Sequence, residues 1–302
     1  MTMKPNFLIL GAAKCGTTSL YYYLKQHPQI CMAEPKEPRF FEMEYAQGMD
    51  FYWQTYFASV WDGEPAIGEA APRNLYLPYV GPRIKTEIPD AKLIVILRNP
   101  IERAFSHWWM TYSTGVEKLS FDAAMVANWQ QLRDGVNFEG EAGESLWREA
   151  IHWGGSYRTV KYRWYLDMGY YAQQLERYLE LFPSTQVKIL FNDDLRKRTQ
   201  DVLEDVYAFL GVDTGFTADT TPQMVGLPQN ALPLLRLAQL TRIQHLVPQS
   251  LRAKILALFR HQSRKQRLNS VTRVWLIEHY APHNRALERL TGRDLVHWDK
   301  MK

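Results

Sequence analysis

Short apolar runs alternate with segments of helical periodicity along most of the chain. An apolar run of about four to eight residues bounded by turn residues is typical of a buried parallel strand. Apolar residues every three to four positions are typical of a helix. The alternation predicts βαβ organisation, which means an α/β fold with a central, mostly parallel sheet flanked by helices. The predicted strands cover residues 6–10, 65–70, 91–98 and 186–192.

Capping and turn residues delimit the predicted helices. Asn99 followed by Pro100 and Glu102 is typical of a helix start, and Gly211 and Gly292 are typical of helix ends. The predicted helices cover residues 17–27, 99–112, 170–182, 199–210, 232–243, 250–260 and 270–290. No internal repeat or low-complexity tract interrupts them. We therefore expect a single domain over residues 1–302, with an insertion at about 115–165 whose Trp, Gly and charged residues suit a cap on the acceptor side.

Charge changes this picture in one region. The net charge of +4 does not indicate nucleic-acid binding, but the stretch between Asp219 and Glu278 contains no acidic residue. Its apolar and basic part, residues 232–267, suits an acceptor, the donor or a membrane surface, and a solvated basic face is the alternative. The basic residues of the stretch are Arg236, Arg242, Arg252, Lys254, Arg260, Arg264, Lys265, Arg267 and Arg273.

Cysteine content and hydropathy suggest a cellular location. Cys15 and Cys31 are too few for a disulfide framework, and no Cys/His cluster offers a metal site. The first predicted strand begins almost at the N-terminus, and no apolar run is long enough to span a membrane. We expect a cytoplasmic protein without a metal, and peripheral membrane contact stays open.

The first predicted strand ends in a glycine-containing loop that feeds a helix. Such a loop is P-loop-like, because unpaired backbone amides and the positive end of the helix dipole point at one anion. Gly11 and Gly16 keep the G-x-x-x-x-G spacing of the nucleoside-triphosphate loop. Thr17, however, stands where that loop has its lysine, and Lys14 precedes the second glycine. We therefore expect a phosphate ligand other than a nucleoside triphosphate.

The carboxyl ends of parallel strands meet at one edge of the sheet, which should bring three side chains together. These are Lys14 in the loop, Glu69 in the second predicted strand and Arg98 at the end of the central one. A carboxylate beside a lysine and an anion cradle suits transfer of an anionic group to a hydroxyl, with Glu69 accepting the proton and Lys14 stabilising the leaving group.

Several ordered motifs resemble those of the sulfotransferases that use 3′-phosphoadenosine 5′-phosphosulfate (PAPS). The closest branch holds the sulfotransferase domains that modify heparan sulfate and their bacterial relatives. The similarity spans nearly the whole chain except the insertion and residues 220–260. The motifs are KCGTTSL at 14–20, PKEPRFF at 35–41, GEAAP at 68–72, LRNPIERAFSHW at 97–108, and three longer stretches at 169–179, 191–212 and 279–298.

The resemblance implies PAPS as co-substrate, adenosine 3′,5′-bisphosphate as product and no metal. It implies that Glu69 is the catalytic base and that Lys14 acts on the phosphosulfate. Ala70 departs from the heparan-type branch, which often has lysine after the base. The residues implied to bind the 5′-phosphosulfate are Lys14, Gly16, Thr17, Thr18 and Ser19; those for the 3′-phosphate are Arg98 and Ser106, with Lys265 and Arg267 in a basic loop before the last helix.

Alternatives remain at the level of the sequence. A P-loop nucleotide kinase or NTPase would use the same loop, but it should carry a lysine after Gly16; a non-catalytic module that binds PAPS is a third reading. The acceptor is expected to be a carbohydrate hydroxyl, with a lipid or another small-molecule alcohol as the alternative. Lys36 and Glu37 fit either an acceptor-side role or anchoring of their loop, and His107 fits packing better than base catalysis.

Overall fold

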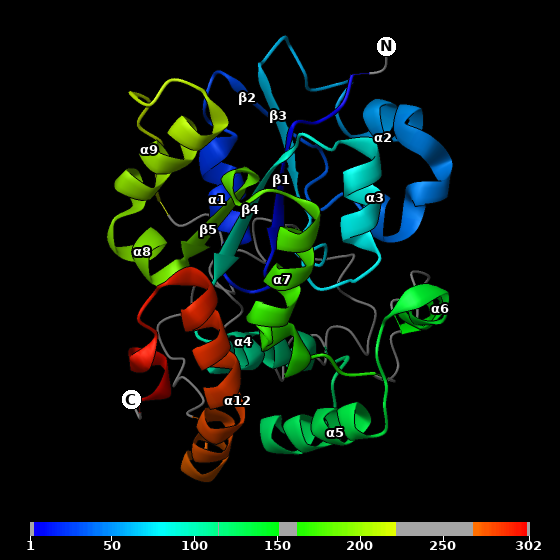
Figure 1. Ribbon diagram of the computed structural model, residues 1–302, viewed down its shortest axis with the longest axis vertical. Coiled ribbons are helices and arrows are strands. Elements are labelled where there is room, and N and C mark those ends of the chain that lie inside the picture. Colours follow the sequence, from blue (N-terminus) through cyan, green and yellow to red (C-terminus); the bar gives the residue numbers. More distant parts are fainter. Residues whose placement is uncertain (1–2, 114, 151–161, 222–267, 301–302) are drawn as a thin grey trace, which may run out of the picture.

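A five-stranded parallel sheet forms the centre of the computed structural model, which describes residues 3–113, 115–150, 162–221 and 268–300. The strands lie in the order β2-β3-β1-β4-β5, and every neighbouring pair is parallel (Figure 1). The predicted fold class is thereby confirmed. The strands are β1 (Phe7–Gly11), β2 (Ile30–Met32), β3 (Ala66–Ala70), β4 (Lys92–Leu97) and β5 (Val187–Phe191).

The edge strand β2 was not predicted from the sequence. It has three residues, Ile30–Met32, which is too short to show a strand period. The segment 65–70 was predicted as the second strand of the chain. It is the third, because β2 precedes it in sequence and pairs with it at the edge of the sheet.

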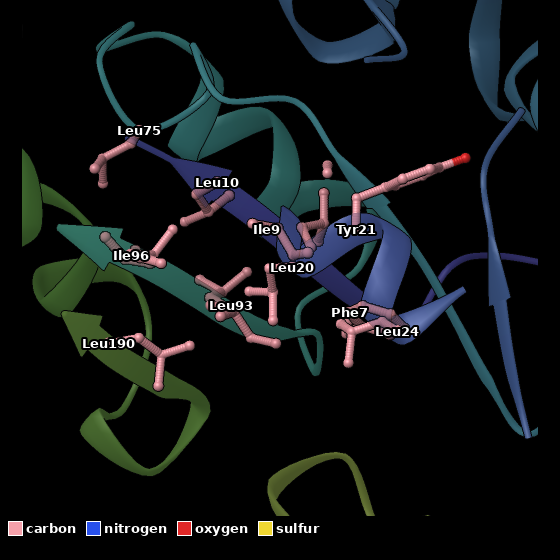
Figure 2. Packing of buried hydrophobic residues seen from close by; sticks show 14 of the residues in the cluster. Phe7, Ile9, Leu10, Leu20, Tyr21, Leu24, Leu75, Leu93, Ile96 and Leu190 are labelled. Carbon is pink, nitrogen blue, oxygen red and sulfur yellow. The ribbon is translucent and has the colours of Figure 1, made fainter. Parts of the chain in front are cut away.

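The core forms because the strand side chains are apolar on both faces. All five residues of β1 are buried, and so are five of the six residues of β4. Figure 2 shows Leu20 and Leu24 of the first helix packing against this layer. Gly68 in β3 is required by that packing, since a Cβ there would lie 2.4 Å from Cζ of Phe7.

The helices predicted at 17–27, 99–112, 170–182, 199–210 and 270–290 are confirmed, with small differences at their ends. Asn99 caps the second of these, because its side chain accepts from the Ile101 amide at 2.9 Å. Gly211 and Gly292 end helices in the left-handed conformation, as expected. The five helices are α1 (Thr17–Leu24), α4 (Pro100–Ser113), α7 (Tyr171–Leu181), α9 (Thr199–Leu210) and α12 (Ser270–Thr291).

Further helices cover the sheet and its carboxyl end. In Figure 1, α4, α5 and α12 lie beyond the sheet, on the side toward which the β4 arrow points. The segments 232–243 and 250–260, predicted as helices, lie outside the described residues. The additional helices are α2 (Gly48–Tyr56), α3 (Val80–Glu87), α5 (Phe121–Arg133), α6 (Gly140–Ala150) and α8 (Asn192–Lys197), with a π-helix at Phe40–Glu44.

A second apolar cluster joins the predicted insertion to the rest of the molecule. It contains Trp108 of α4, Met125 of α5 and Tyr280 of α12, all buried. Trp147 of α6 is fully buried in the main core, so it is not available to stack on a sugar. The single domain and the acceptor-side cap at 115–165 remain predictions.

Candidate active site

The loop between β1 and α1 contains two residues with positive φ, a backbone conformation that favours glycine. Lys14 has φ +71° and Gly16 has φ +111°, both in the left-handed region. A Cβ on Gly16 would lie 2.7 Å from Nδ2 of Asn192. That amide group donates to the carbonyl of Cys15 at 2.7 Å, so the loop is fixed from the start of α8.

The amino end of α1 presents backbone donors next to this loop. The first helical hydrogen bond of α1 runs from the Leu20 amide to the Gly16 carbonyl at 3.1 Å. The amides of Thr17, Thr18 and Ser19 therefore precede it, and they lie at the positive end of the helix dipole. This is the anion-binding arrangement that the sequence predicted.

Lys14 lies against α4, at the side of this arrangement. Its Nζ is 3.4 Å from Sδ of Met110. Burial lowers the pKa of the Lys14 ammonium, and the negative charge of Glu37 opposes that shift. The nearby guanidinium of Arg98 lowers the pKa of Lys14 further. The site thus gathers positive charge in a partly dehydrated environment, where charge acts more strongly than in water.

Arg98 closes the donor side of the loop, as the strand order predicted. Its Nη1 donates to the Lys14 carbonyl at 3.4 Å, and its Nη2 lies 3.3 Å from a carboxylate oxygen of Glu102. Ser106 is one helical turn after Glu102 and one turn before Met110 on α4. Because residues four apart share a helix face, Ser106 lies between the residue that contacts Arg98 and the residue that contacts Lys14.

Glu69 is more enclosed than the sequence suggested. Its carboxylate accepts from the hydroxyl of Tyr52 at 2.6 Å and from the amide of Asn74 at 3.0 Å, and the residue is only 1% exposed. Burial raises the pKa of Glu69 to about 8. The negative charge of Glu37 raises the pKa of Lys14.

Glu37 is a residue for which the sequence left its function open. It lies in the PKEPRFF segment with φ +65°, and its carboxylate accepts from Nζ of Lys36 at 2.6 Å. The Glu37 side chain is 39% exposed. The separation of Glu37 and Lys14 in the sequence hid this electrostatic influence, although both residues lie in motifs that were recognised.

A buried carboxylate anchors the segment that carries Glu37. Glu42 is 1% exposed and pairs with Arg39 at 2.8 Å and with Arg73 at 2.9 Å. Nε1 of Trp147 donates to the same carboxylate at 3.0 Å, which ties α6 to this segment. Arg73 immediately precedes Asn74, so one network fixes the surroundings of both candidate carboxylates.

His107 lies on the buried side of α4. Its Nδ1 is 3.4 Å from Nη1 of the fully buried Arg103, and burial together with that guanidinium lowers the pKa of His107 well below its usual range. The imidazole therefore stays neutral at physiological pH, with Nδ1 as the acceptor. This contact fits the packing reading of His107.

The remaining expectations concern the basic loop before the last helix, a metal site and a membrane span. Lys265 and Arg267 lie outside the described residues. Within the described ranges, no group of three or more His, Cys, Asp or Glu side chains could hold a metal ion. The same part of the chain contains no helix with the length and apolar character of a membrane span.

Replacing Glu69 by Gln is expected to make stability less dependent on pH. Between about pH 4.5, the ordinary pKa of a glutamate, and about pH 8, the folded protein retains a proton on Glu69, whereas the unfolded chain releases it. The free energy of unfolding of the wild type therefore falls as pH rises through that window. As pH rises from about 5 to about 9, the free energy of unfolding of Glu69→Gln should therefore increase relative to that of the wild type by on the order of a few kcal/mol. Urea denaturation at several pH values measures this difference.

The matched control for this measurement is Glu141→Gln, at an exposed position of α6. This variant should follow the wild type at every pH. A stability difference for Glu69→Gln that is the same at both ends of the window would show that Glu69 is ionised in the folded protein.

Comparison with known proteins identifies the family. A model described as the sulfotransferase domain matches residues 4–226, and the chain belongs to this family. The crystal structure of a sulfotransferase from Alicyclobacillus acidocaldarius is 28% identical, with a TM-score of 0.67, and the match covers 99% of this chain and 100% of that one. The predicted resemblance to bacterial sulfotransferases is confirmed.

Curated relatives point in the same direction. The membrane-associated sulfotransferase kil1 of Dictyostelium discoideum is 41% identical over 106 residues, which are 34% of this chain and 22% of that protein. A bifunctional heparan sulfate N-deacetylase/N-sulfotransferase 4 of Mus musculus is 27% identical over 214 residues, 69% of this chain and 22% of that protein. The chain thus spans about a fifth of the length of these relatives.

Proposed function

We propose that the protein transfers the sulfuryl group of PAPS to an acceptor hydroxyl. The observation that carries the proposal is the loop at Lys14, which leads into the backbone amides at the amino end of α1 and has the guanidinium of Arg98 beside it. Membership of the sulfotransferase domain family supports the same reaction. The kinase alternative is not favoured, because Thr17 follows Gly16 where a kinase needs lysine.

In the proposed reaction the acceptor oxygen attacks sulfur in line with the bond to the bridging oxygen. That bond breaks, a new S–O bond forms, and a carboxylate takes the proton of the hydroxyl. Adenosine 3′,5′-bisphosphate leaves, with the charge that develops on its 5′-phosphate stabilised by Lys14 and the amides at Thr17 and Thr18. A phosphosulfate carries less charge at the transferred group than a triphosphate, so no metal is required.

Glu37 is the carboxylate that the geometry favours as the base. It is exposed to an approaching acceptor, and its charge is felt by Lys14. Glu69, the residue assigned by the motif, remains the second candidate; its two oxygens accept hydrogen bonds from Tyr52 and Asn74, so an acceptor hydroxyl would have to displace one of these donors. Burial also raises the pKa of Glu69 to about 8.

The proposed acceptor is a carbohydrate hydroxyl. The relatives named for heparan sulfate N-sulfation support a glycan, and the helices α5 and α6 of the predicted cap support binding of a large acceptor. The alternative is a lipid or another small-molecule alcohol. A cytoplasmic location also remains a proposal, supported by Cys15 and Cys31, which are buried and not joined in a disulfide.

Incubation with labelled PAPS and a panel of glycans, lipids and phenols tests the function. A product heavier by one sulfate should form with at least one acceptor, at the same rate in excess EDTA and in Mg²⁺. A phosphorylated product from ATP, or loss of turnover in EDTA, would contradict the proposal. A chain that binds adenosine 3′,5′-bisphosphate but sulfates nothing in the panel would support the non-catalytic reading.

A further inference from the structure

One carboxylate is shared between two guanidinium groups at the donor side of the loop. Glu102 of α4 lies 3.3 Å from Nη2 of Arg98 and 3.9 Å from Nη2 of Arg273. The second guanidinium comes from α12, far away in sequence. Two cations and one anion leave this cluster with one excess positive charge, which favours a further anion.

The hydrogen-bonding capacity of Arg273 is poorly used by the protein itself. Its side chain is 12% exposed, and its Nε is buried without a hydrogen-bond partner in the described part of the chain. A guanidinium has five donors in a fixed fork, and 3.9 Å to Glu102 is too long for a hydrogen bond. Buried donors that the protein does not satisfy are expected to have a reason.

The position of Arg273 on its helix points to an anion. It lies at the end of the first turn of α12, close to the positive end of that helix dipole, where a cation alone is unfavourable. An anion bound between the helix end and the guanidinium would reverse this repulsion.

The surrounding packing fixes this end of α12 on α4 and α5. The hydroxyl of Thr272 donates to Asp122 at 2.6 Å, and the side chain of Asn269 accepts from the Val271 amide at 3.0 Å. One turn beyond Arg273, Leu276 is buried in the cluster shared by the three helices. The guanidinium is therefore held at the level of Arg98 and Glu102, one turn of α4 before Ser106.

We propose that Arg273 binds the 3′-phosphate of the donor together with Arg98, with Glu102 orienting both guanidiniums. The inference rests on the proposed function, because that function supplies a nucleotide with a 3′-phosphate. A phosphate monoester carries about −1.5 to −2 charges and three acceptor oxygens, which match the excess charge and the free donors of this cluster. The 3′-phosphate is thereby bound by Arg98, just after β4, and by Arg273 of α12.

Calorimetric titration with two nucleotides isolates this contact. Adenosine 3′,5′-bisphosphate carries the 3′-phosphate, whereas adenosine 5′-monophosphate lacks it. Replacing Arg273 by Ala should weaken binding of the bisphosphate about tenfold to a hundredfold and leave binding of the monophosphate within about twofold. Arg273→Lys should recover part of the loss, since lysine restores the positive charge but not the planar guanidinium with its several donors.

The control is Arg285→Ala, which removes the same charge from an exposed position of α12. It should bind both nucleotides as the wild type does. Equal weakening of both nucleotides by Arg273→Ala would assign Arg273 to support of the fold and overturn the inference, and so would an unchanged preference for the bisphosphate. If the wild type itself shows no such preference, the proposed function fails first.

Discussion

Replacing Glu37 by Gln is expected to lower kcat about a hundredfold to ten thousandfold, because the variant keeps the shape of the side chain but cannot accept a proton. Binding of adenosine 3′,5′-bisphosphate should change by less than about threefold, since Glu37 is proposed to contact the acceptor and not the nucleotide. Steady-state rates with PAPS and the best acceptor, together with calorimetry, measure the two quantities separately.

The matched comparison is Glu69→Gln, which makes the same chemical change at the residue assigned by the motif. Glu69 is fully buried and bound by Tyr52 and Asn74, so we expect this variant to change stability with pH more than it changes kcat. A loss of turnover larger for Glu69→Gln than for Glu37→Gln would reverse the assignment and return the base to Glu69.

The sequence predicted the sheet and the donor loop because both depend on local patterns. A few consecutive residues are enough to recognise an apolar run such as residues 91–98 or the spacing of Gly11 and Gly16. The order of strands then brought Lys14 and Arg98 to one edge without further information. A strand of three residues, β2, carries no such pattern and was missed.

The sequence could not decide between carboxylates, because ionisation depends on neighbours that are distant along the chain. Glu69 was predicted to lie beside Lys14, and that remains a prediction; the residues that enclose its carboxylate are Tyr52 and Asn74, and burial raises its pKa. Glu37 looked like a loop residue between two prolines. Its proximity to Lys14 follows from the path of the segment after β2, which residue types do not encode.

The Arg98–Glu102–Arg273 cluster was hidden for the same reason. Arg98 and Glu102 are one turn apart and were both noted, but Arg273 was only one of several basic residues in an acid-free stretch. Packing of α12 on α4 brings Arg273 beside Glu102. Sequence reasoning therefore identifies elements of the donor site, whereas the tertiary packing identifies which charges share it.

Replacing Lys14 by Ala is expected to lower kcat about a hundredfold to a thousandfold. The ammonium lies in a partly buried site next to Met110, so the charge that develops on the leaving oxygen would lose a partner that water replaces poorly. Donor affinity should fall less than kcat, because the helix amides and Arg98 still hold the nucleotide. Single-turnover rates and the Kd for adenosine 3′,5′-bisphosphate measure the two losses.

The control for Lys14→Ala is Lys4→Ala, which removes the same charge at the opposite end of β1. Lys4 is 40% exposed and pairs with Glu87 at 3.4 Å, away from the loop, so its loss should leave both quantities unchanged. If Lys14→Ala weakened donor binding but left kcat unchanged, the lysine would bind ground state and transition state equally. Leaving-group stabilisation would then have to come from the amides at the start of α1, whose dipole does not depend on any side chain.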